Sequence, residues 1–486
     1  MTTEKKYHNF INGIWKAPVG GQYFNQHNPA RLSEVTGSYP LSGAADTLEA
    51  IGAAEAAYPL WRSLSVHKRA EYLKRALQLM KEQRHEIAHV LTLENGKTLA
   101  ESLVEVEAAV KEMDWQIAEG IRLFGSTIPS AMEKMMTMVM REPLGVASII
   151  SPWNFPFNVP CRKSIPALMA GNTCVFKPAS LTPQTGYKFT RLLEDAGLPA
   201  GVFNMVIGSG KNVGDIMVSD PRINAISFTG STEVGMHVNQ RASEKGIRTQ
   251  LEMGGKNPVV ILEDADMDLA VKATVKAAFA CAGQWCTSTS RAVVVKNRIE
   301  EFTSRVVEKT KKLTVGNGLE QGIHVGPVCG TGQMENILRY INIGKEEGAR
   351  LLTGGYRLAG SGYDDGCFVA PTVFSGVRND MTIARVEIFG PVLSIMEVED
   401  FDHALHVAND TPFGLCSSIF TNDMKKAMRF IAGTQVGLTH VNEMTAYKEP
   451  QLPFGGIKAS GFGLPEAGSS GLEFFSNQKS VYIKIP

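Results

Sequence analysis

The feature that most constrains the fold of this chain is a regular alternation, in its central part, of short apolar runs and helical stretches. The runs lie at residues 145–150, 173–176, 202–207 and 225–228. Each run ends in glycine, proline or polar residues, and a helical pattern follows it. This spacing predicts right-handed βαβ crossovers and a buried parallel sheet, whose ligands bind beyond the carboxyl ends of the strands. The fold class is therefore α/β.

The same rhythm returns later in the chain and predicts a second α/β domain. We expect strands at residues 258–262 and 291–295, and helices at residues 267–280 and 300–312. Before the first block, residues 46–125 carry Ala, Leu, Glu and Lys at helical spacing, which predicts several amphipathic helices. Residues 479–484 form an alternating strand, either an ordinary edge strand or one that pairs with another subunit. A length of 486 residues allows about three domains.

Charge and hydropathy exclude several classes of partner. The chain has 49 Lys and Arg against 49 Asp and Glu, and a formal charge of zero argues against binding to nucleic acid. No run of about 18 apolar residues occurs, and the first residues lack the apolar segment of a signal peptide. We therefore expect a cytoplasmic protein with no membrane partner. The seven cysteines are too scattered for a disulfide framework, which leaves reduced thiols and one candidate nucleophile among them.

One literal motif indicates a different class of protein. His85, Glu86 and His89 match the H-E-x-x-H pattern, which on a helix places two imidazoles on one face for zinc, with Glu as base. Glu94 and Glu101 lie nearby, but no established third-ligand motif follows. The alternative is two histidines on an amphipathic helix. We expect no metal and keep a zinc protease as the different-class hypothesis.

Two glycine-rich turns are compatible with nucleotide binding. Residues 208–214 and 228–235 each follow a predicted strand and open a helix, so their free N–H groups either face an anion or simply make the turn. Gly96-Lys97-Thr98 resembles the end of a P-loop, but Leu91 stands where its first glycine belongs.

Three polar side chains fall at the predicted ends or beginnings of strands. Cys286 lies in a turn before a strand, Glu252 ends a strand ahead of two glycines, and Asn154 follows a strand between two prolines. Each also has a structural explanation: a small buried thiol, a solvated carboxylate and a turn-forming amide.

Together these residues resemble the aldehyde dehydrogenase superfamily across essentially the whole chain. The matching motifs are Pro152-Trp153-Asn154-Phe155-Pro156, Lys177-Pro178-Ala179, Phe228-Thr229-Gly230-Ser231-Thr232-Glu233-Val234-Gly235, Glu252-Met253-Gly254-Gly255-Lys256-Asn257-Pro258, Gly283-Gln284-Trp285-Cys286, Glu387-Ile388-Phe389-Gly390-Pro391 and Pro453-Phe454-Gly455-Gly456. The resemblance implies a Rossmann-like cofactor domain at residues 1–124 and 142–252 and an α/β catalytic domain at residues 253–469. It also implies a small β oligomerisation ribbon at residues 125–141 and 470–486, and hence a homodimer or homotetramer.

The resemblance assigns the chemistry to the same three side chains. Cys286 is the nucleophile that attacks an aldehyde, and its thiolate is the reactive species. Asn154 and the backbone N–H of the cysteine stabilise the oxyanion. Glu252 matches the general base that hydrolyses the resulting thioester, which relatives that transfer the acyl group to coenzyme A lack. The implied product is a free carboxylic acid.

The implied cofactor is NAD or NADP, which supplies the electron acceptor. The residues that match the family's cofactor contacts are Trp153, Lys177, Gly230, Ser231, Met253, Glu387 and Phe389. In the family the matching Lys and Glu hold the two riboses. Ser180 stands where NAD-preferring relatives carry Glu, and this favours NADP, with NAD also usable, because Glu would repel a 2′-phosphate.

Substrate choice rests on Arg162. It matches an arginine that succinate-semialdehyde dehydrogenases use to hold the substrate carboxylate, but Ala280 stands at the position of their second arginine. The alternative is a structural ion pair. The C-terminal region is also similar to 2-oxoglutarate semialdehyde dehydrogenases. The candidate substrate is therefore a carboxylated semialdehyde, and the alternatives are a broad-specificity aliphatic or aromatic aldehyde dehydrogenase and a catalytically silent relative.

Overall fold

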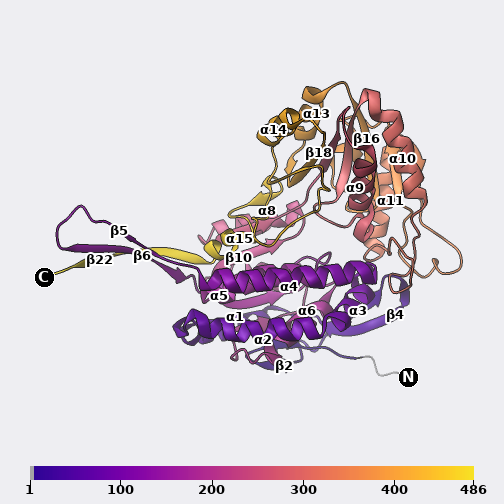
Figure 1. Cartoon of the computed structure of the whole chain (residues 1–486). Helices are drawn as coiled ribbons and strands as arrows, with labels where there is room; N and C mark the ends of the chain where they lie inside the picture. Colours follow the sequence, from indigo (N-terminus) through magenta and orange to yellow (C-terminus); the bar gives the residue numbers. More distant parts are fainter. Residues whose placement is uncertain (1–4) are drawn as a thin grey trace.

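Two large sheets organise the chain, whose structure is a computed structural model that describes residues 5–486. The first four residues of the predicted cofactor domain lie outside the described residues. Figure 1 shows one sheet with its helices below, the other above, and a long ribbon that projects to one side.

The first sheet has eight strands in the order β2-β1-β9-β8-β7-β10-β11-β21. Five central strands run parallel: β9 (Phe203–Met205), β8 (Thr173–Lys177), β7 (Val146–Ile150), β10 (Ile223–Thr229) and β11 (Arg248–Glu252). The antiparallel edge strands are β1 (Asn9–Ile11), β2 (Ile14–Lys16) and β21 (Gly461–Phe462). The direction of winding reverses between β7 and β10, which is where sheets of this kind bind their ligands.

Helices cover both faces of this sheet because successive residues of each strand point to opposite sides. In β8, Cys174 and Phe176 join an apolar cluster with one set of helices, whereas Val175 packs into a cluster on the other face. The helices are α1 (Ala44–Ser63), α2 (Val66–Glu82), α3 (Arg84–Asn95), α4 (Leu99–Ile121), α5 (Asn158–Ala170), α6 (Pro183–Asp195), α7 (Asp215–Met217) and α8 (Thr232–Ser243). The predicted amphipathic helices before the first block are confirmed as α1 to α4.

The third predicted run is the exception to the regular βα pattern. Its strand is limited to β9, and a π-helix (Gly210–Gly214) followed by the short α7 stands where a regular helix was expected. Glycines at positions 208, 210 and 214 explain the difference, because glycine disfavours a regular helix.

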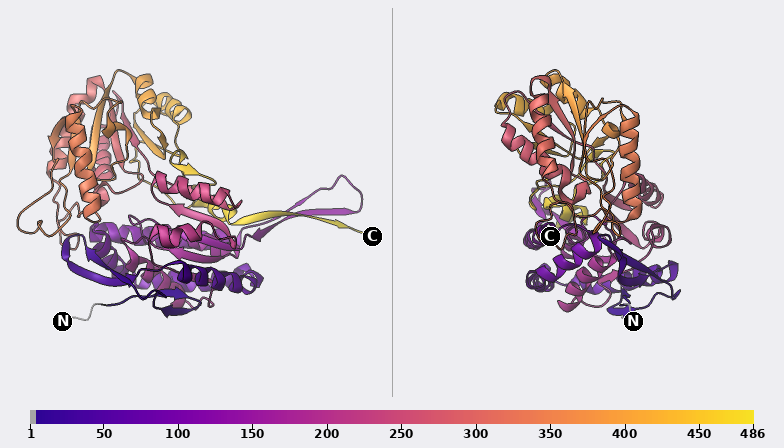
Figure 2. Two further views of the ribbon diagram at one scale, coloured as in Figure 1. Left: turned by 180° about the vertical axis from the view of Figure 1, so that it is seen from behind. Right: turned by 90° about the vertical axis from the view of Figure 1, so that its right-hand side faces the viewer.

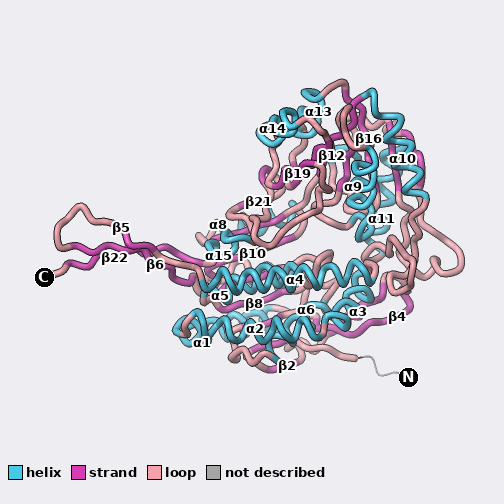
Figure 3. The backbone as a smooth tube through the Cα atoms, viewed as in Figure 1, coloured by secondary structure: helices cyan, strands magenta, loops and turns pink. Residues whose placement is uncertain are grey.

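The second sheet has seven strands in the order β14-β15-β16-β13-β12-β18-β19, parallel except for β14. The strands are β14 (Arg350–Thr353), β15 (Thr372–Ser375), β16 (Val392–Val398), β13 (Thr289–Val295), β12 (Asn257–Ile261), β18 (Cys416–Phe420) and β19 (Leu438–Val441). Figure 3 shows its helices gathered around it: α9 (Met267–Phe279), α10 (Ile299–Lys311), α11 (Thr331–Glu346), α13 (Phe401–Asn409) and α14 (Met424–Gly433). The predicted second α/β block is confirmed.

Short elements complete these two parts of the molecule. They are β3 (Tyr23–Asn28), β4 (Arg31–Pro40), β17 (Phe413–Gly414), β20 (Ile457–Lys458), α12 (Thr382–Arg385), α15 (Gly468–Phe474) and two 3₁₀ turns (Ala280–Gly283 and Lys296–Arg298). Within residues 5–486, no helix combines the length and the apolar character that a membrane crossing requires.

The ribbon is a three-stranded antiparallel sheet in the order β22-β6-β5. It is formed by β5 (Ser126–Ile128), β6 (Met135–Pro143) and the terminal strand β22 (Ser476–Lys484). The left-hand view in Figure 2 shows that it projects away from both large sheets. The predicted terminal strand is thus confirmed, and β6 of the same chain is its partner.

Candidate active site

A cavity of about 710 Å³ lies at the carboxyl ends of the first sheet's strands and reaches across to the second half of the chain. The predicted site residues that line it are Trp153, Asn154, Arg162, Lys177, Ser180, Gly230, Ser231, Met253, Cys286, Glu387 and Phe389. The strand ends explain this convergence, because β7, β8, β10 and β11 all run in the same direction. Glu252 is the one predicted residue that is not in the cavity wall.

Cys286 lies in the turn between the 3₁₀ segment Ala280–Gly283 and β13. It is half-buried, whereas the other six cysteines are buried. Asn257 holds the turn by donating from Nδ2 to the carbonyl oxygens of Cys286 and Ser288, both at 2.8 Å. Burial raises the pKa of the Cys286 thiol to about 12; Glu387 raises it too, and Arg162 lowers it. The thiol therefore needs a proton acceptor before it can attack.

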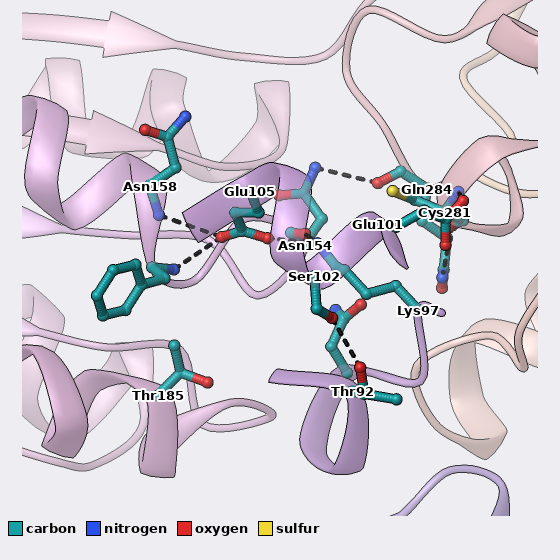
Figure 4. Close-up of polar contacts among 12 residues, drawn as sticks. Thr92, Lys97, Glu101, Ser102, Glu105, Asn154, Asn158, Thr185, Cys281 and Gln284 are labelled. Atoms are coloured by element: carbon teal, nitrogen blue, oxygen red, sulfur yellow. Dashed lines mark hydrogen bonds and ion pairs between the residues drawn. The ribbon is translucent and has the colours of Figure 1, made fainter. Parts of the chain in front are cut away.

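Asn154 is tied to the turn that carries the thiol. It is 6% exposed, and its Nδ2 donates to the backbone oxygen of Gln284 at 3.1 Å (Figure 4). Gln284 in turn accepts from the N–H of Cys329 at 2.8 Å and donates to the oxygen of Cys281 at 3.1 Å. An amide has two N–H groups, so one of them remains to face the cavity.

A buried ion pair holds the Asn154 loop from behind. Lys97 donates from Nζ to the backbone oxygen of Asn154 at 2.6 Å and pairs with Glu105 at 2.5 Å. The other oxygen of Glu105 accepts from the N–H groups of Phe157 and Asn158, at 3.0 and 3.1 Å (Figure 4). Lys97 is therefore a buried structural cation, and the partial P-loop match around it does not form a phosphate site.

Glu252 lies behind the cavity wall at the end of β11. It is 4% exposed, so its interpretation as a solvated carboxylate is wrong, and it accepts from the N–H of Gly456 at 3.2 Å. Burial and the charge of Glu466 raise the pKa of Glu252 well above its usual range, while Lys163 and Arg162 lower it. A carboxylate with a raised pKa is a stronger base once it is ionised.

Arg162 forms the structural ion pair that was its alternative interpretation, and it also lines the cavity. On α5 it is 4% exposed and pairs with Glu112 at 3.4 Å and with Glu466 at 3.7 Å. Its guanidinium also stacks over the ring of Phe454 at 4.6 Å and lines the cavity.

The other end of the cavity presents a cation and a helix terminus. Lys177 ends β8, and burial lowers its pKa to about 8. Its Nζ donates only to the neighbouring carbonyl of Pro178, at 3.2 Å, among the described residues, so further donors are free for a ligand. Ser231 caps the N-terminus of α8, and Gly230 precedes it where an added Cβ would lie 2.5 Å from the Phe228 ring. A helix N-terminus of this kind favours phosphate.

Between that end and the thiol lies Glu387. Its carboxylate accepts from the N–H of Gly255 at 3.0 Å, and burial raises its pKa to about 7. An added Cβ at Gly254 would lie 2.0 Å from Glu387 Oε2, so glycine is required for this approach. Lys177, the N-terminus of α8 and Glu387 thus line one cavity, and they are the kinds of group that bind the hydroxyls and phosphates of a dinucleotide.

The H-E-x-x-H residues lie on a helix, as predicted, but within the described part of the chain they are not part of a cluster that could bind a metal ion. His85, Glu86 and His89 are exposed on α3, and Glu86 pairs with Lys188. The described residues contain no group of three or more His, Cys, Asp or Glu side chains that could hold a metal ion.

Several residues of the site were missed from the sequence. Lys163 pairs with Glu466 behind Glu252, and Lys448 lines the cavity beside Arg162. Two adjacent cations within the otherwise uncharged and buried α5 are a signal that a buried anion faces them. Nothing in the local sequence marks Glu466 or Lys448, because each reaches the site through the fold.

A thiol in a large cavity at the switch point of a parallel sheet is typical of an oxidoreductase that works through a covalent intermediate. The chain belongs to the aldehyde dehydrogenase family, whose sequence model matches residues 15–481, and it is an NAD(P)-dependent enzyme of that family. The predicted family, fold class and kind of enzyme are confirmed.

Curated relatives and solved structures are similar to this chain over nearly its whole length. It is 40% identical over 484 residues to the alpha-ketoglutaric semialdehyde dehydrogenase of Bacillus subtilis, covering 100% of this chain and 99% of that protein. It is 41% identical over 471 residues to the 2,5-dioxopentanoate dehydrogenase of Saccharolobus solfataricus, covering 96% and 97%. Staphylococcus aureus betaine aldehyde dehydrogenase in complex with NAD+ superposes with a TM-score of 0.96 at 31% identity, covering 99% of this chain and 95% of that one. An NADP-dependent enzyme of E. coli superposes at 0.95 with 35% identity, covering 99% and 98%.

Proposed function

We propose that this enzyme oxidises a carboxylated semialdehyde of the 2-oxoglutarate semialdehyde type to the free dicarboxylic acid. The observation that carries the proposal is that one cavity holds both the Cys286 thiol and the Arg162 guanidinium. An aldehyde that reacts at the thiol would then have an anion-binding group within the same enclosure. Two relatives named for the oxidation of this semialdehyde support the assignment.

In the first half of the reaction, the Cys286 thiol loses its proton to solvent water in the cavity, and the thiolate sulfur attacks the aldehyde carbon. Negative charge develops on the former carbonyl oxygen, and the free N–H of Asn154 and the backbone N–H of Cys286 would stabilise it. Lys177, the N-terminus of α8 and Glu387 would hold NAD(P)+. Bound NAD(P)+ supplies an acceptor for the hydride that leaves the substrate carbon.

In the second half, Glu252 takes a proton from a water molecule that attacks the thioester on Cys286. The carbon–sulfur bond breaks, the departing thiolate takes up the proton held by Glu252, and the acid leaves. Because Glu252 lies against Gly456 behind the cavity wall, we infer that its side chain turns toward Cys286 for this step. An added Cβ at Gly455 would lie 2.8 Å from Glu252 Oε1, so glycine at this position leaves room beside the carboxylate.

NADP is the preferred cofactor in this proposal, with NAD also accepted. Ser180 and Lys211 line the same end of the cavity, where a hydroxyl and an ammonium suit a 2′-phosphate. The nearby carboxylate of Asp215 is engaged by His237 at 2.9 Å.

The functional division follows the predicted domain ranges, with cofactor binding at residues 1–124 and 142–252 and catalysis at residues 253–469. The ribbon of residues 125–141 and 470–486 would join protomers into a homodimer or homotetramer. Its exposed apolar side chains support this assignment.

Two variants test the reaction. Cys286→Ala is expected to abolish NAD(P)H formation with every aldehyde, because no other group can form the thioester. Glu252→Gln is expected to give a burst of about one NAD(P)H per site and then a steady rate lowered about 100-fold or more, because hydrolysis loses its base. Rapid mixing with stopped-flow absorbance separates the two phases.

Cys367→Ala is the matched control, because this cysteine is buried outside the cavity. Normal turnover in Cys286→Ala would rule out the thioester route. A panel of carboxylated, aliphatic and aromatic aldehydes tests the substrate class, and equal kcat/KM values across the panel would contradict it.

A further inference from the structure

Lys448 lies in the segment between β19 and β20, outside every motif that predicted the active site. It is half-buried and lines the same cavity as Cys286 and Arg162. Building on the proposed function, we propose that Lys448 is the second cation that binds the far carboxylate of the substrate, alongside Arg162. It is a specificity residue that selects aldehydes carrying a carboxylate.

The two cations are held together by shared neighbours. The ring of Phe454 lies 4.6 Å from the Arg162 guanidinium and 5.8 Å from Lys448 Nζ. With its amide oxygen turned toward them, Asn158 accepts from Lys448 Nζ at 2.8 Å and from Arg162 Nη2 at 3.2 Å. These two hydrogen bonds limit the separation of the nitrogen atoms to 6.0 Å, a span that the two oxygens of one carboxylate can bridge.

Charge explains why Arg162 does not suffice. Its guanidinium already faces Glu112 and Glu466, so these two carboxylates offset its attraction for a further anion. Lys448 differs, because within residues 5–486 no carboxylate lies within ion-pairing distance of its Nζ. Lys448 therefore supplies the uncompensated positive charge at this wall of the cavity.

The position relative to the thiol fits an aldehyde with a carboxylate at its other end. Phe454 belongs to a small apolar cluster with Leu415 and Ala467, and Cys286 packs against that cluster. The thiol thus packs against the same apolar cluster whose Phe454 ring lies beside both cations. Ala280, at the position where succinate-semialdehyde dehydrogenases carry a second arginine, is not in the cavity wall. Lys448 reaches the site from a different segment and supplies the positive charge that the second arginine supplies in those enzymes.

The test compares succinate semialdehyde with butanal, which has the same chain length without the carboxylate. In Lys448→Met, kcat/KM for succinate semialdehyde relative to butanal is expected to fall about 10- to 100-fold, mainly through KM, as for the loss of one charge-assisted contact. Lys448→Arg is expected to recover most of the ratio because it keeps the charge. Repeating the series with 2,5-dioxopentanoate tests the longer substrate.

Lys425→Met is the matched control, because it removes an exposed lysine far from the cavity wall. A ratio in Lys448→Met within about twofold of wild type, with preference for the carboxylated aldehyde intact, overturns the role of Lys448 and leaves the proposed function standing. A wild-type enzyme without such a preference overturns both. Circular dichroism melting of each variant separates a binding defect from loss of fold.

Discussion

In the proposed cofactor site, Ser180 presents a short hydroxyl to the cavity. Its Oγ donates to the carbonyl oxygen of Gly208 at 3.1 Å, which anchors it beside the loop that carries Lys211. A carboxylate in this place would accept from a ribose 2′-hydroxyl and repel a 2′-phosphate. We therefore propose that Ser180 largely sets the choice between the two cofactors.

Ser180→Glu is expected to shift the ratio of kcat/KM for NADP over NAD toward NAD by about 10- to 100-fold, because it adds a like charge and a hydroxyl acceptor at once. Steady-state rates with each cofactor at saturating aldehyde measure the change. Ser180→Ala is the control and should change the ratio much less, since it adds no charge. Retention of the full NADP preference in Ser180→Glu would show that this residue does not discriminate.

Among single residues, those that belong to short motifs could be predicted from the sequence. Residues that only tertiary packing brings to the site could not. Cys286 and Asn154 lie in contiguous segments whose chemistry can be read locally. Glu466 and Lys448 come from the C-terminal region, and only tertiary packing brings them beside α5. The position of Glu252 behind the wall was also beyond local inference, because it depends on Gly456, 204 positions away.

Among the elements, α4 and the turn before it act as a support for the loop that carries Asn154. The loop has no regular structure of its own between β7 and α5, so its shape depends on partners. The Lys97–Glu105 pair supplies them by binding the carbonyl of Asn154 and two N–H groups at the start of α5. Both side chains are fully buried, and removing one partner of such a pair leaves an uncompensated charge.

Lys97→Met is therefore expected to lower the free energy of unfolding by about 3–5 kcal/mol and kcat by about 10-fold or more, because Glu105 loses its partner and Asn154 its anchor. Denaturant unfolding and single-turnover kinetics measure the two effects. Lys111→Met, on the exposed face of α4, should change stability by less than about 1 kcal/mol. If Lys97→Met kept wild-type stability and kcat, the support role would have to be abandoned.

Elements with a strong internal pattern were predictable, and those defined only by their partners were not. The strands at β7 and β8 and the helices α9 and α10 follow the expected ranges closely, because apolar periodicity determines them. β21 has two residues and pairs Leu251 with Phe462 across the first sheet. A strand so short carries no periodic signal, and its existence depends on β11 being present.

For the whole molecule, the ribbon is the part whose surface does not fit an isolated chain. In the β22–β6 register, Val481 lies opposite Met138 and Ile483 opposite Met136, so these side chains share one face of the ribbon. Met136 is 47% exposed and Ile483 is 44% exposed. A contiguous apolar face on an arm that projects from the body is typical of an interface, and a second copy of the chain is the occupant proposed for it.

Placing charge on that face tests the assembly. Met138→Asp combined with Val481→Asp is expected to convert the oligomer into monomers, because burying unpaired carboxylates would raise the dissociation constant about 100-fold or more. The folded body should survive, since the ribbon packs away from both large sheets. Sedimentation velocity gives the mass, and circular dichroism reports the fold.

Thr137→Asp with Ser480→Asp is the control, because it adds the same charge on the opposite face of the ribbon and should disturb assembly less. A wild-type chain that sediments as a monomer, or an oligomer that survives the first pair of substitutions, would place the interface elsewhere.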